Sequence, residues 1–178
     1  RYPMISYPDY ALDGRATLDE PSQWLLLPYG YNPQALADGL ALRKISEPAR
    51  RIDQVLRRFR QQAYSYTLEP PLLGRHSVDE FLYGTRAGFC EHYSGAFVFL
   101  MRAAGIPARV VTGYQGGELN PVDGYLTVRQ SDAHAWAEVW LARRGWVRID
   151  PTAAVSPERV QRGMAGAVPP RPPFGIEG

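Results

Sequence analysis

The chain has 178 residues, a formal net charge of +2 at neutral pH and a single cysteine. This length is sufficient for one domain with a sizeable core, and no block of like charge indicates nucleic-acid binding. One cysteine excludes both an internal disulfide and a cysteine-based metal cluster. The longest apolar runs, such as AFVFLM, fall well short of the roughly 20 residues that cross a bilayer, so we expect this portion to be soluble.

The organisation along the chain indicates three regions. Residues 1–45 are expected to be an N-terminal extension that leads from a preceding segment. Residues 46–155 are expected to form the core, and residues 156–178 a short helix and a proline-rich linker. The chain begins with Arg1 rather than methionine and has no signal peptide, so we interpret it as the excised soluble portion of a longer protein.

The first two elements are predicted from periodicity. The run SQWLLLP, within the Pro- and Tyr-rich residues 1–33, is typical of a strand that ends a preceding β segment. From Ser46 to Tyr66 apolar residues recur at helical spacing, which predicts an amphipathic helix with Val55 and Phe59 on its buried stripe.

Two further helices are predicted around the cysteine. Ser77 and Glu80 have the spacing of a capping box and predict the start of a short helix. A longer helix is expected from Cys90 to Ala104, where Gly105 then ends it. A thiol at a helix N-terminus faces unpaired N–H groups and the positive end of the dipole, and both stabilise a thiolate. This placement favours a nucleophile over the alternative, a small buried apolar side chain.

The C-terminal half of the core is predicted to be rich in strands. Two strands are expected at 108–115 and 125–130, separated by the loop GGELNPVDG. From Ala133 to Leu141 the side chains alternate with a period of two, and a second strand follows a tight turn at 146–150. These last two segments predict an antiparallel hairpin with a short loop.

The register of this hairpin brings an imidazole and a carboxylate together. Pairing Glu138 with Arg148 gives an opposite-charge pair and sets two tryptophans opposite each other. Asp150 then becomes the diagonal neighbour of His134, roughly 7–8 Å away at Cα and within side-chain reach. A carboxylate on one imidazole nitrogen fixes the tautomer and leaves the other nitrogen free to take a thiol proton.

Neighbouring residues offer alternatives. His92 lies two residues after the cysteine and about 200° around the helix, so we interpret it as a packing or substrate-rim residue. Asp132 is an alternative carboxylate partner for the imidazole. Glu91 is either a first-turn acid that complements the helix dipole or a group that shifts the pKa of the thiol. Trp136 shares the His134 face, where it either walls a substrate tunnel or packs in the core.

Three motifs, in order, resemble those of the transglutaminase-like superfamily of papain-like folds, and in particular its bacterial membrane-anchored TgpA type. They are GFCEHYSGAFVFLMRAAGIPARVVTGY, HAWAEVW and GWVRIDPT. The resemblance implies an α+β fold in which a catalytic cysteine begins a helix that packs on an antiparallel β-sheet carrying histidine and aspartate. Carried over by position, Cys90 is the nucleophile, His134 the base and Asp150 the orienting carboxylate.

The resemblance implies thiol-dependent acyl transfer, in which a Cys90 thioester passes a glutamine acyl group to a primary amine. The alternatives are a cysteine peptidase or amidase acting on envelope peptides, and a noncatalytic scaffold that binds peptides. The backbone N–H of Cys90 is expected to help hold the oxyanion, with Tyr64 or Tyr66 as a second donor. The candidate substrate contacts are Tyr66, Glu91, His92 and Trp136.

No metal or cofactor is expected. The three histidines lack the partners of a zinc site, and no acidic cluster has calcium-loop spacing. The expected partner is a peptide or protein substrate, cell-envelope components included, and nucleic acid is not expected. The resemblance further implies a parent protein anchored in the bacterial inner membrane, with this domain in the periplasm.

Overall fold

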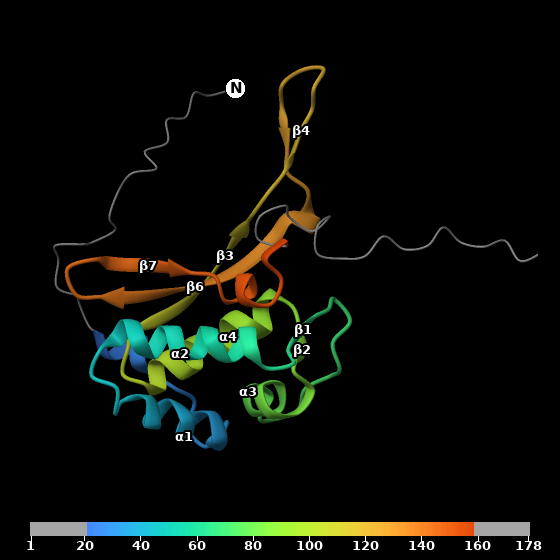
Figure 1. Cartoon of the computed structure of the whole chain (residues 1–178). Helices are drawn as coiled ribbons and strands as arrows, with labels where there is room; N and C mark the ends of the chain where they lie inside the picture. Colours follow the sequence, from blue (N-terminus) through green and yellow to red (C-terminus); the bar gives the residue numbers. More distant parts are fainter. Residues whose placement is uncertain (1–20, 159–178) are drawn as a thin grey trace, which may run out of the picture.

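The computed structural model describes residues 21–158, and it combines helices with an antiparallel sheet (Figure 1). The sheet has the order β3–β6–β7 and consists of β3 (Ala108–Tyr114), β6 (Ala133–Leu141) and β7 (Gly145–Ile149). The main helices are α1 (Pro33–Leu42), α2 (Pro48–Gln61) and α4 (Cys90–Ala103), and the short α3 (Ser77–Asp79) runs on into a π-helical turn, η2 (Glu80–Thr85). Helix α4 lies between the sheet and α1.

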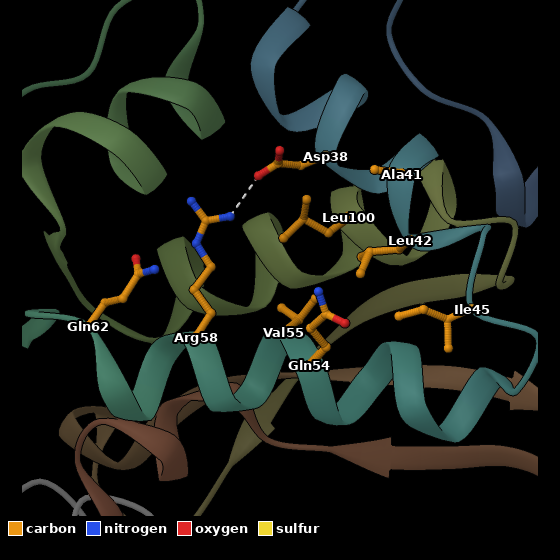
Figure 2. A pocket seen from close by; sticks show the side chains of 9 residues that line it. All are labelled: Asp38, Ala41, Leu42, Ile45, Gln54, Val55, Arg58, Gln62 and Leu100. Atoms are coloured by element: carbon orange, nitrogen blue, oxygen red, sulfur yellow. Dashed lines mark hydrogen bonds and ion pairs between the residues drawn. The ribbon is translucent and has the colours of Figure 1, made fainter.

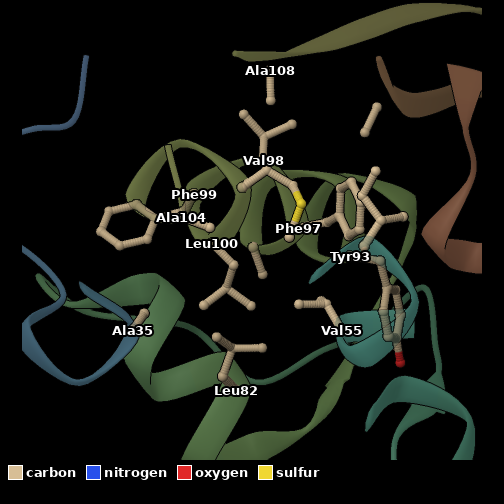
Figure 3. Packing of buried hydrophobic residues seen from close by; sticks show 14 of the residues in the cluster. Ala35, Val55, Leu82, Tyr93, Phe97, Val98, Phe99, Leu100, Ala104 and Ala108 are labelled. Atoms are coloured by element: carbon tan, nitrogen blue, oxygen red, sulfur yellow. The ribbon is translucent and has the colours of Figure 1, made fainter. Parts of the chain in front are cut away.

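Helix α4 is the centre of the core, and it matches the predicted 90–104 helix to within one residue. Tyr93, Phe97 and Leu100 are at most 1 % exposed, because the sheet covers one side of α4 and other helices the other (Figure 3). Burying each such side chain stabilises the fold by about 1.5–3 kcal/mol relative to exposure. On the α1 side Gly39 makes a close approach possible, since a Cβ there would lie 2.3 Å from the Ala103 Cβ.

Helices α1 and α3 cap each other's N-termini. The side-chain oxygen of Asn32, just before α1, accepts hydrogen bonds from the N–H groups of Val78 (3.0 Å) and Asp79 (3.4 Å). In return, the Asp79 carboxylate accepts from the N–H groups of Gln34 (2.9 Å) and Ala35 (2.8 Å). The first-turn N–H groups of both helices are thereby satisfied by side chains of the other helix's segment.

The capping box predicted at Ser77 and Glu80 is wrong. Ser77 is the first residue of α3 and His76 precedes it without a side-chain cap bond. The Glu80 carboxylate instead accepts hydrogen bonds from the N–H groups of Gly74 (2.6 Å) and His76 (3.2 Å). Because Asn32 already covers the free N–H groups of α3, no local hydroxyl is needed there.

Helix α2 is shorter than the predicted 46–66. It ends at Gln61, because Gln62 is extended (φ −94°, ψ 162°). The chain then forms β1 (Ser65–Tyr66), which pairs in parallel with β2 (Ala87–Gly88). This pairing sets the segment after α2 directly beside the residues that lead into α4, and so carries a tyrosine to the start of that helix.

The run SQWLLLP is not a strand. Pro21–Leu25 forms a 3₁₀ helix, η1, and Trp24 packs edge-on against Trp146 with ring centroids 5.3 Å apart. The contact with the sheet therefore comes through an aromatic pair rather than through strand pairing. The predictions for residues 1–20 and for the linker from residue 159 onward lie outside the described residues.

The strand predicted at 125–130 is largely absent. Only β5 (Leu126–Thr127) forms, and it pairs with β4 (Glu118–Leu119) in a hairpin that stands out from the body of the molecule (Figure 1). The chain then turns into a short 3₁₀ helix, η3 (Gln130–Asp132), before entering β6.

The predicted register of the β6–β7 hairpin is confirmed. Glu138 lies opposite Arg148, and Trp140 lies opposite Trp146. The predicted charge pair is wrong, however, because Glu138 binds Arg109 of β3 at 2.7 Å. Strand β6 is central and has a neighbour on each side, so its glutamate had a second candidate partner that the hairpin alone does not reveal.

Candidate active site

A pocket of about 310 Å³ lies where the start of α4 meets β3 and β6. Cys90 and His134 both line it, as do Tyr66 and Glu91. Further wall residues that the sequence did not indicate are Thr112, Gly113, Gln130 and Ser131. Thr112 and Gly113 lie opposite Ala135 and His134 in the β3–β6 register, so only knowledge of that pairing could have identified them.

Cys90 is the first residue of α4, as predicted, and it is 8 % exposed. One turn further on, Ser94 is fully buried and its hydroxyl donates a hydrogen bond to the Ala135 carbonyl at 3.0 Å. Ala135 directly follows His134 on β6. This buried bond therefore fixes the helix that carries the thiol against the strand that carries the imidazole.

His134 and Asp150 form the contact that the hairpin register predicts. His134 Nε2 lies 2.7 Å from Asp150 Oδ2, and the two side chains are 0 % and 10 % exposed. The other carboxylate oxygen, Oδ1, accepts a hydrogen bond from the Thr152 N–H at 3.2 Å. The alternative carboxylate, Asp132, instead accepts from the Arg129 N–H at 2.8 Å. Asp150, and not Asp132, is thus the carboxylate that contacts the imidazole.

The second imidazole nitrogen of His134, Nδ1, has different surroundings. His134 Nδ1 is buried and makes no hydrogen bond in the structure. Burial by itself lowers the pKa of His134, but the hydrogen bond to Asp150 and the charges of Asp150 and Cys90 outweigh burial and raise the pKa above its ordinary value. Nδ1 is therefore the imidazole nitrogen that the contact with Asp150 leaves unoccupied.

Trp136 packs beside the imidazole and is not part of the pocket wall. Its ring stacks on His134 with centroids 6.4 Å apart and an interplanar angle of 27°. A Cβ at Gly113 would lie 2.9 Å from the indole, so glycine at this position leaves room for the ring. The predicted placement of Trp136 on the His134 face is confirmed, and the indole supports the histidine from the side.

His92 does not face the thiol, in agreement with the helical phase. It lines a separate cavity of about 220 Å³ with Phe81, and its Nδ1 accepts a long hydrogen bond from the Phe89 N–H at 3.4 Å. Burial lowers the pKa of His92, and the Glu91 charge partly opposes that shift. Glu91 lines both this cavity and the pocket that contains the cysteine.

The two tyrosines considered as oxyanion donors have different surroundings. The Tyr64 hydroxyl is buried and donates to the Leu82 carbonyl at 2.9 Å, so its proton is already engaged away from the thiol. Tyr66 lines the pocket beside Cys90. The parallel pairing of β1 with β2 thus places Tyr66, and not Tyr64, at the pocket.

A larger cavity, of about 570 Å³, lies between α1, α2 and α4 (Figure 2). Arg58 reaches across it and binds Asp38 at 2.8 Å, above a floor that includes Leu100 and Val55. Its lining holds no cysteine, histidine or serine, so its size does not make it the reactive site. Within residues 21–158 no cluster of metal-binding side chains occurs, and no helix is long and apolar enough to cross a membrane.

Comparison of the sequence with known families identifies one family. The sequence model of the transglutaminase-like superfamily matches residues 34–151, and the chain belongs to that superfamily. The protein-glutamine gamma-glutamyltransferase of Pseudomonas aeruginosa is 46 % identical over 170 residues, which cover 94 % of this chain and 25 % of that protein. The chain therefore spans about a quarter of that relative's length.

Solved structures agree with the fold. The periplasmic domain of TgpA from Pseudomonas aeruginosa superimposes with a TM-score of 0.81 and 50 % identity, over 83 % of this chain and 52 % of that one. A putative cysteine protease from Cytophaga hutchinsonii matches with a TM-score of 0.54 and 23 % identity, over 78 % and 44 % of the two chains. The α+β, papain-like transglutaminase fold and the likeness to the TgpA type are both confirmed.

Proposed function

We propose that the chain catalyses thiol-dependent acyl transfer from a glutamine carboxamide to a primary amine. The observation that carries this proposal is the buried His134 ring, held by Asp150 through Nε2 while Nδ1 remains for the thiol of Cys90. The name of the Pseudomonas relative supports the choice of glutamine as donor and amine as acceptor.

In the first half-reaction His134 takes the Cys90 proton, and the thiolate sulfur attacks the carboxamide carbon. A sulfur–carbon bond forms, and the carbonyl oxygen carries the negative charge of the tetrahedral intermediate. The carbon–nitrogen bond then breaks as His134 returns its proton to the nitrogen. Ammonia leaves, and a thioester of Cys90 remains.

In the second half-reaction a neutral primary amine attacks the thioester carbon. His134 takes a proton from the attacking nitrogen, the carbon–sulfur bond breaks, and the thiol of Cys90 is restored with a new amide as product. Water in place of the amine gives hydrolysis with the same groups. Asp150 keeps the imidazole in the tautomer and orientation that both half-reactions need.

The pocket supplies candidate groups for substrate contact. The backbone N–H of Cys90 opens α4 and is available to stabilise the oxyanion, because first-turn N–H groups lack partners within the helix. Tyr66 is the proposed second donor, since it lines the pocket. Glu91 is the charged wall residue proposed to attract the cationic form of an approaching amine. His92 is proposed to border this route from its adjoining cavity.

We further propose a periplasmic location within a membrane-anchored parent, with a peptide or protein of the cell envelope as substrate. The support is the similarity to the periplasmic domain of TgpA. Fractionation of cells that carry the full-length parent tests the location. Recovery of the protein in the inner membrane with this domain open to external protease supports it, and protection from that protease contradicts it.

The activity test uses a glutamine-bearing protein with blocked lysines and a fluorescent primary amine, in the presence of EDTA. Amine incorporation and ammonia release are followed together. Both are expected for the wild-type chain and are expected to vanish in Cys90→Ala and His134→Gln. His76→Gln is the matched control, because His76 lies before α3, outside the pocket, and accepts the Asn32 N–H at 3.0 Å.

The other outcomes separate the alternatives. Peptide cleavage without amine incorporation assigns the chain to the cysteine peptidases. Ammonia release without amine incorporation indicates an amidase, in which water reaches the thioester first. Silence in both assays, together with an unreactive Cys90, favours the peptide-binding scaffold. Loss of amine incorporation in EDTA alone would show that a divalent metal is required.

A further inference from the structure

Arg148 of β7 makes three polar or ring contacts beside the candidate active site. Its Nη2 lies 3.6 Å from Asp150 Oδ2, the same oxygen that His134 contacts. Its guanidinium carbon lies 4.1 Å from the centroid of the Trp136 ring. It also donates a short hydrogen bond to the side-chain oxygen of Gln115, just beyond β3.

These contacts enclose the imidazole on two sides. Asp150 holds His134 through Nε2, and Trp136 stacks against the imidazole ring. Arg148 contacts both of these neighbours, and its third contact, Gln115, is tied to the chain near the pocket because its N–H donates to the Asp132 carbonyl at 2.8 Å. The guanidinium thus joins the carboxylate, the indole and the pocket edge.

We propose that Arg148 is a positioning residue, which acts through Asp150 and Trp136 to hold the His134 ring in the orientation that proton transfer needs. The inference rests on the proposed roles of Cys90, His134 and Asp150. At 3.6 Å the guanidinium leaves the Asp150 oxygen free for the shorter bond to His134. It restrains the carboxylate without replacing the imidazole as its partner.

Geometry rather than charge makes arginine suitable here. A guanidinium is planar, presents several N–H groups in fixed directions and stacks on aromatic rings, whereas a lysine ammonium is a point charge on a flexible stem. The Arg148 side chain is 47 % exposed, so its ion pair with Asp150 is screened by water and contributes little to folding. A role in orientation therefore predicts effects on reactivity that exceed the effects on stability.

Several ionisable groups face the His134 pocket, and each enters the pH behaviour. Helix α4 contributes Cys90 and Glu91, and β1 contributes Tyr66. Asp132 of η3 directly follows the wall residue Ser131, but its carboxylate accepts the Arg129 N–H. The end of β7 contributes Arg148 and is followed by Asp150. Because only one cysteine is present, alkylation by iodoacetamide reports on the thiol of this site alone.

The experiment measures the rate of iodoacetamide alkylation of the 178-residue chain against pH, for wild type, Arg148→Lys and Arg148→Gln. Both variants are expected to move the midpoint upward and to slow alkylation at pH values below the wild-type midpoint. There a shift of one pH unit slows alkylation roughly tenfold, because the thiolate fraction falls by about that factor. Urea unfolding of each variant is expected to change much less.

Arg109→Gln is the matched control. The Arg109 guanidinium carbon also lies 4.1 Å from a tryptophan centroid, that of Trp146, and Arg109 also pairs with a carboxylate, that of Glu138. Its hydrogen bonds and ring contacts within residues 21–158 are with Glu138, Trp24 and Trp146, and not with His134 or Asp150. Its alkylation midpoint is expected to match that of wild type even if its stability falls.

Distinct results would overturn the inference. Wild-type behaviour of Arg148→Lys with a shift in Arg148→Gln would show that only the charge matters. Equal shifts in the Arg148 and Arg109 variants would show general loosening of the sheet, and no shift in any variant would remove the role altogether. An ordinary thiol profile in wild type would instead overturn the proposed function itself, and the inference with it.

Discussion

The junction of α4 with the sheet and the β4–β5 hairpin are neighbours along the chain, but they are built in opposite ways. At the junction Ser94 is fully buried and His134 is 3 % exposed. In the hairpin Leu119 and Leu126 are 64 % and 61 % exposed. The chain passes from the hairpin through η3, which lines the pocket, into β6. The buried wall of the pocket therefore continues along the chain into an arm that the core does not hold.

The difference follows from what each segment packs against. Side chains of β6 meet α4 on one face and have paired strands on both edges, so their positions are fixed by several neighbours at once. Strands β4 and β5 pair only with each other, and an isolated two-stranded hairpin is marginally stable in water. Reactivity should thus depend on the junction, and folding should barely depend on the hairpin.

The largest expected effect comes from Asp150→Asn. Asparagine keeps the size of the side chain but removes the negative charge that stabilises imidazolium and fixes the ring tautomer. We expect the rate of amine incorporation to fall by up to about 10⁴-fold. The matched control is Asp123→Asn in the hairpin, whose carboxylate accepts the Tyr125 N–H at 3.0 Å. Equal rates in the two variants would contradict the assigned role of Asp150.

The next effect tests the core beneath the junction. Phe97 is fully buried on α4, two turns after the cysteine. Truncation to alanine removes its buried ring and leaves a cavity, so Phe97→Ala is expected to lower the free energy of unfolding by about 3–5 kcal/mol. Urea unfolding followed by far-UV circular dichroism measures this loss. A cost below 1 kcal/mol would show that α4 is not the centre of the core.

A smaller effect concerns the pH dependence of stability. Because contacts with Asp150 and Cys90 raise the folded-state pKa of His134 above 6.5, they stabilise the fold below that pH. The contribution is lost as pH rises through the raised pKa. Asp150→Asn should therefore destabilise the chain more at pH 6 than at pH 9, as measured by urea unfolding at both values. The opposite order would mean that the imidazole is not protonated in the folded state at pH 6.

The smallest expected effect is that of Leu126→Ser in β5. The side chain is 61 % exposed and its strand has a single partner, so the free energy of unfolding should change by no more than about 0.5 kcal/mol. The same urea titration used for Phe97→Ala provides the comparison. A loss of several kcal/mol would show that the hairpin belongs to the core after all.

Local signals account for most of what the sequence predicted. The helix that begins at Cys90 is predicted by the helical spacing of its apolar residues and by Gly105, which ends it. The β6–β7 register follows from the alternation of side chains along the strand and from the short turn. That register alone was sufficient to bring His134 to Asp150. Each of these inferences uses residues within about twenty positions of one another, where periodicity and turn chemistry are informative.

The errors occurred where a partner lies far away along the chain. Glu138 pairs with Arg109 of β3. Its strand, β6, is central and has a neighbour on each side, but the hairpin sequence predicts only the neighbour β7. The capping box failed because Asn32 caps α3 from another segment. Tyr66 reached the pocket through a parallel pairing, which has no local turn signal. Packing of distant segments decided each case, and a single sequence does not record it.

The exchanged caps of α1 and α3 have a consequence for the order in which the chain folds. Their four hydrogen bonds join residues 44 to 47 positions apart, so neither helix has a complete start signal until the intervening chain has closed. Helix α4 and the β6–β7 hairpin need no such closure. We expect helix α4 and the β6–β7 hairpin each to form early as local elements, and α1 with α3 to join them late.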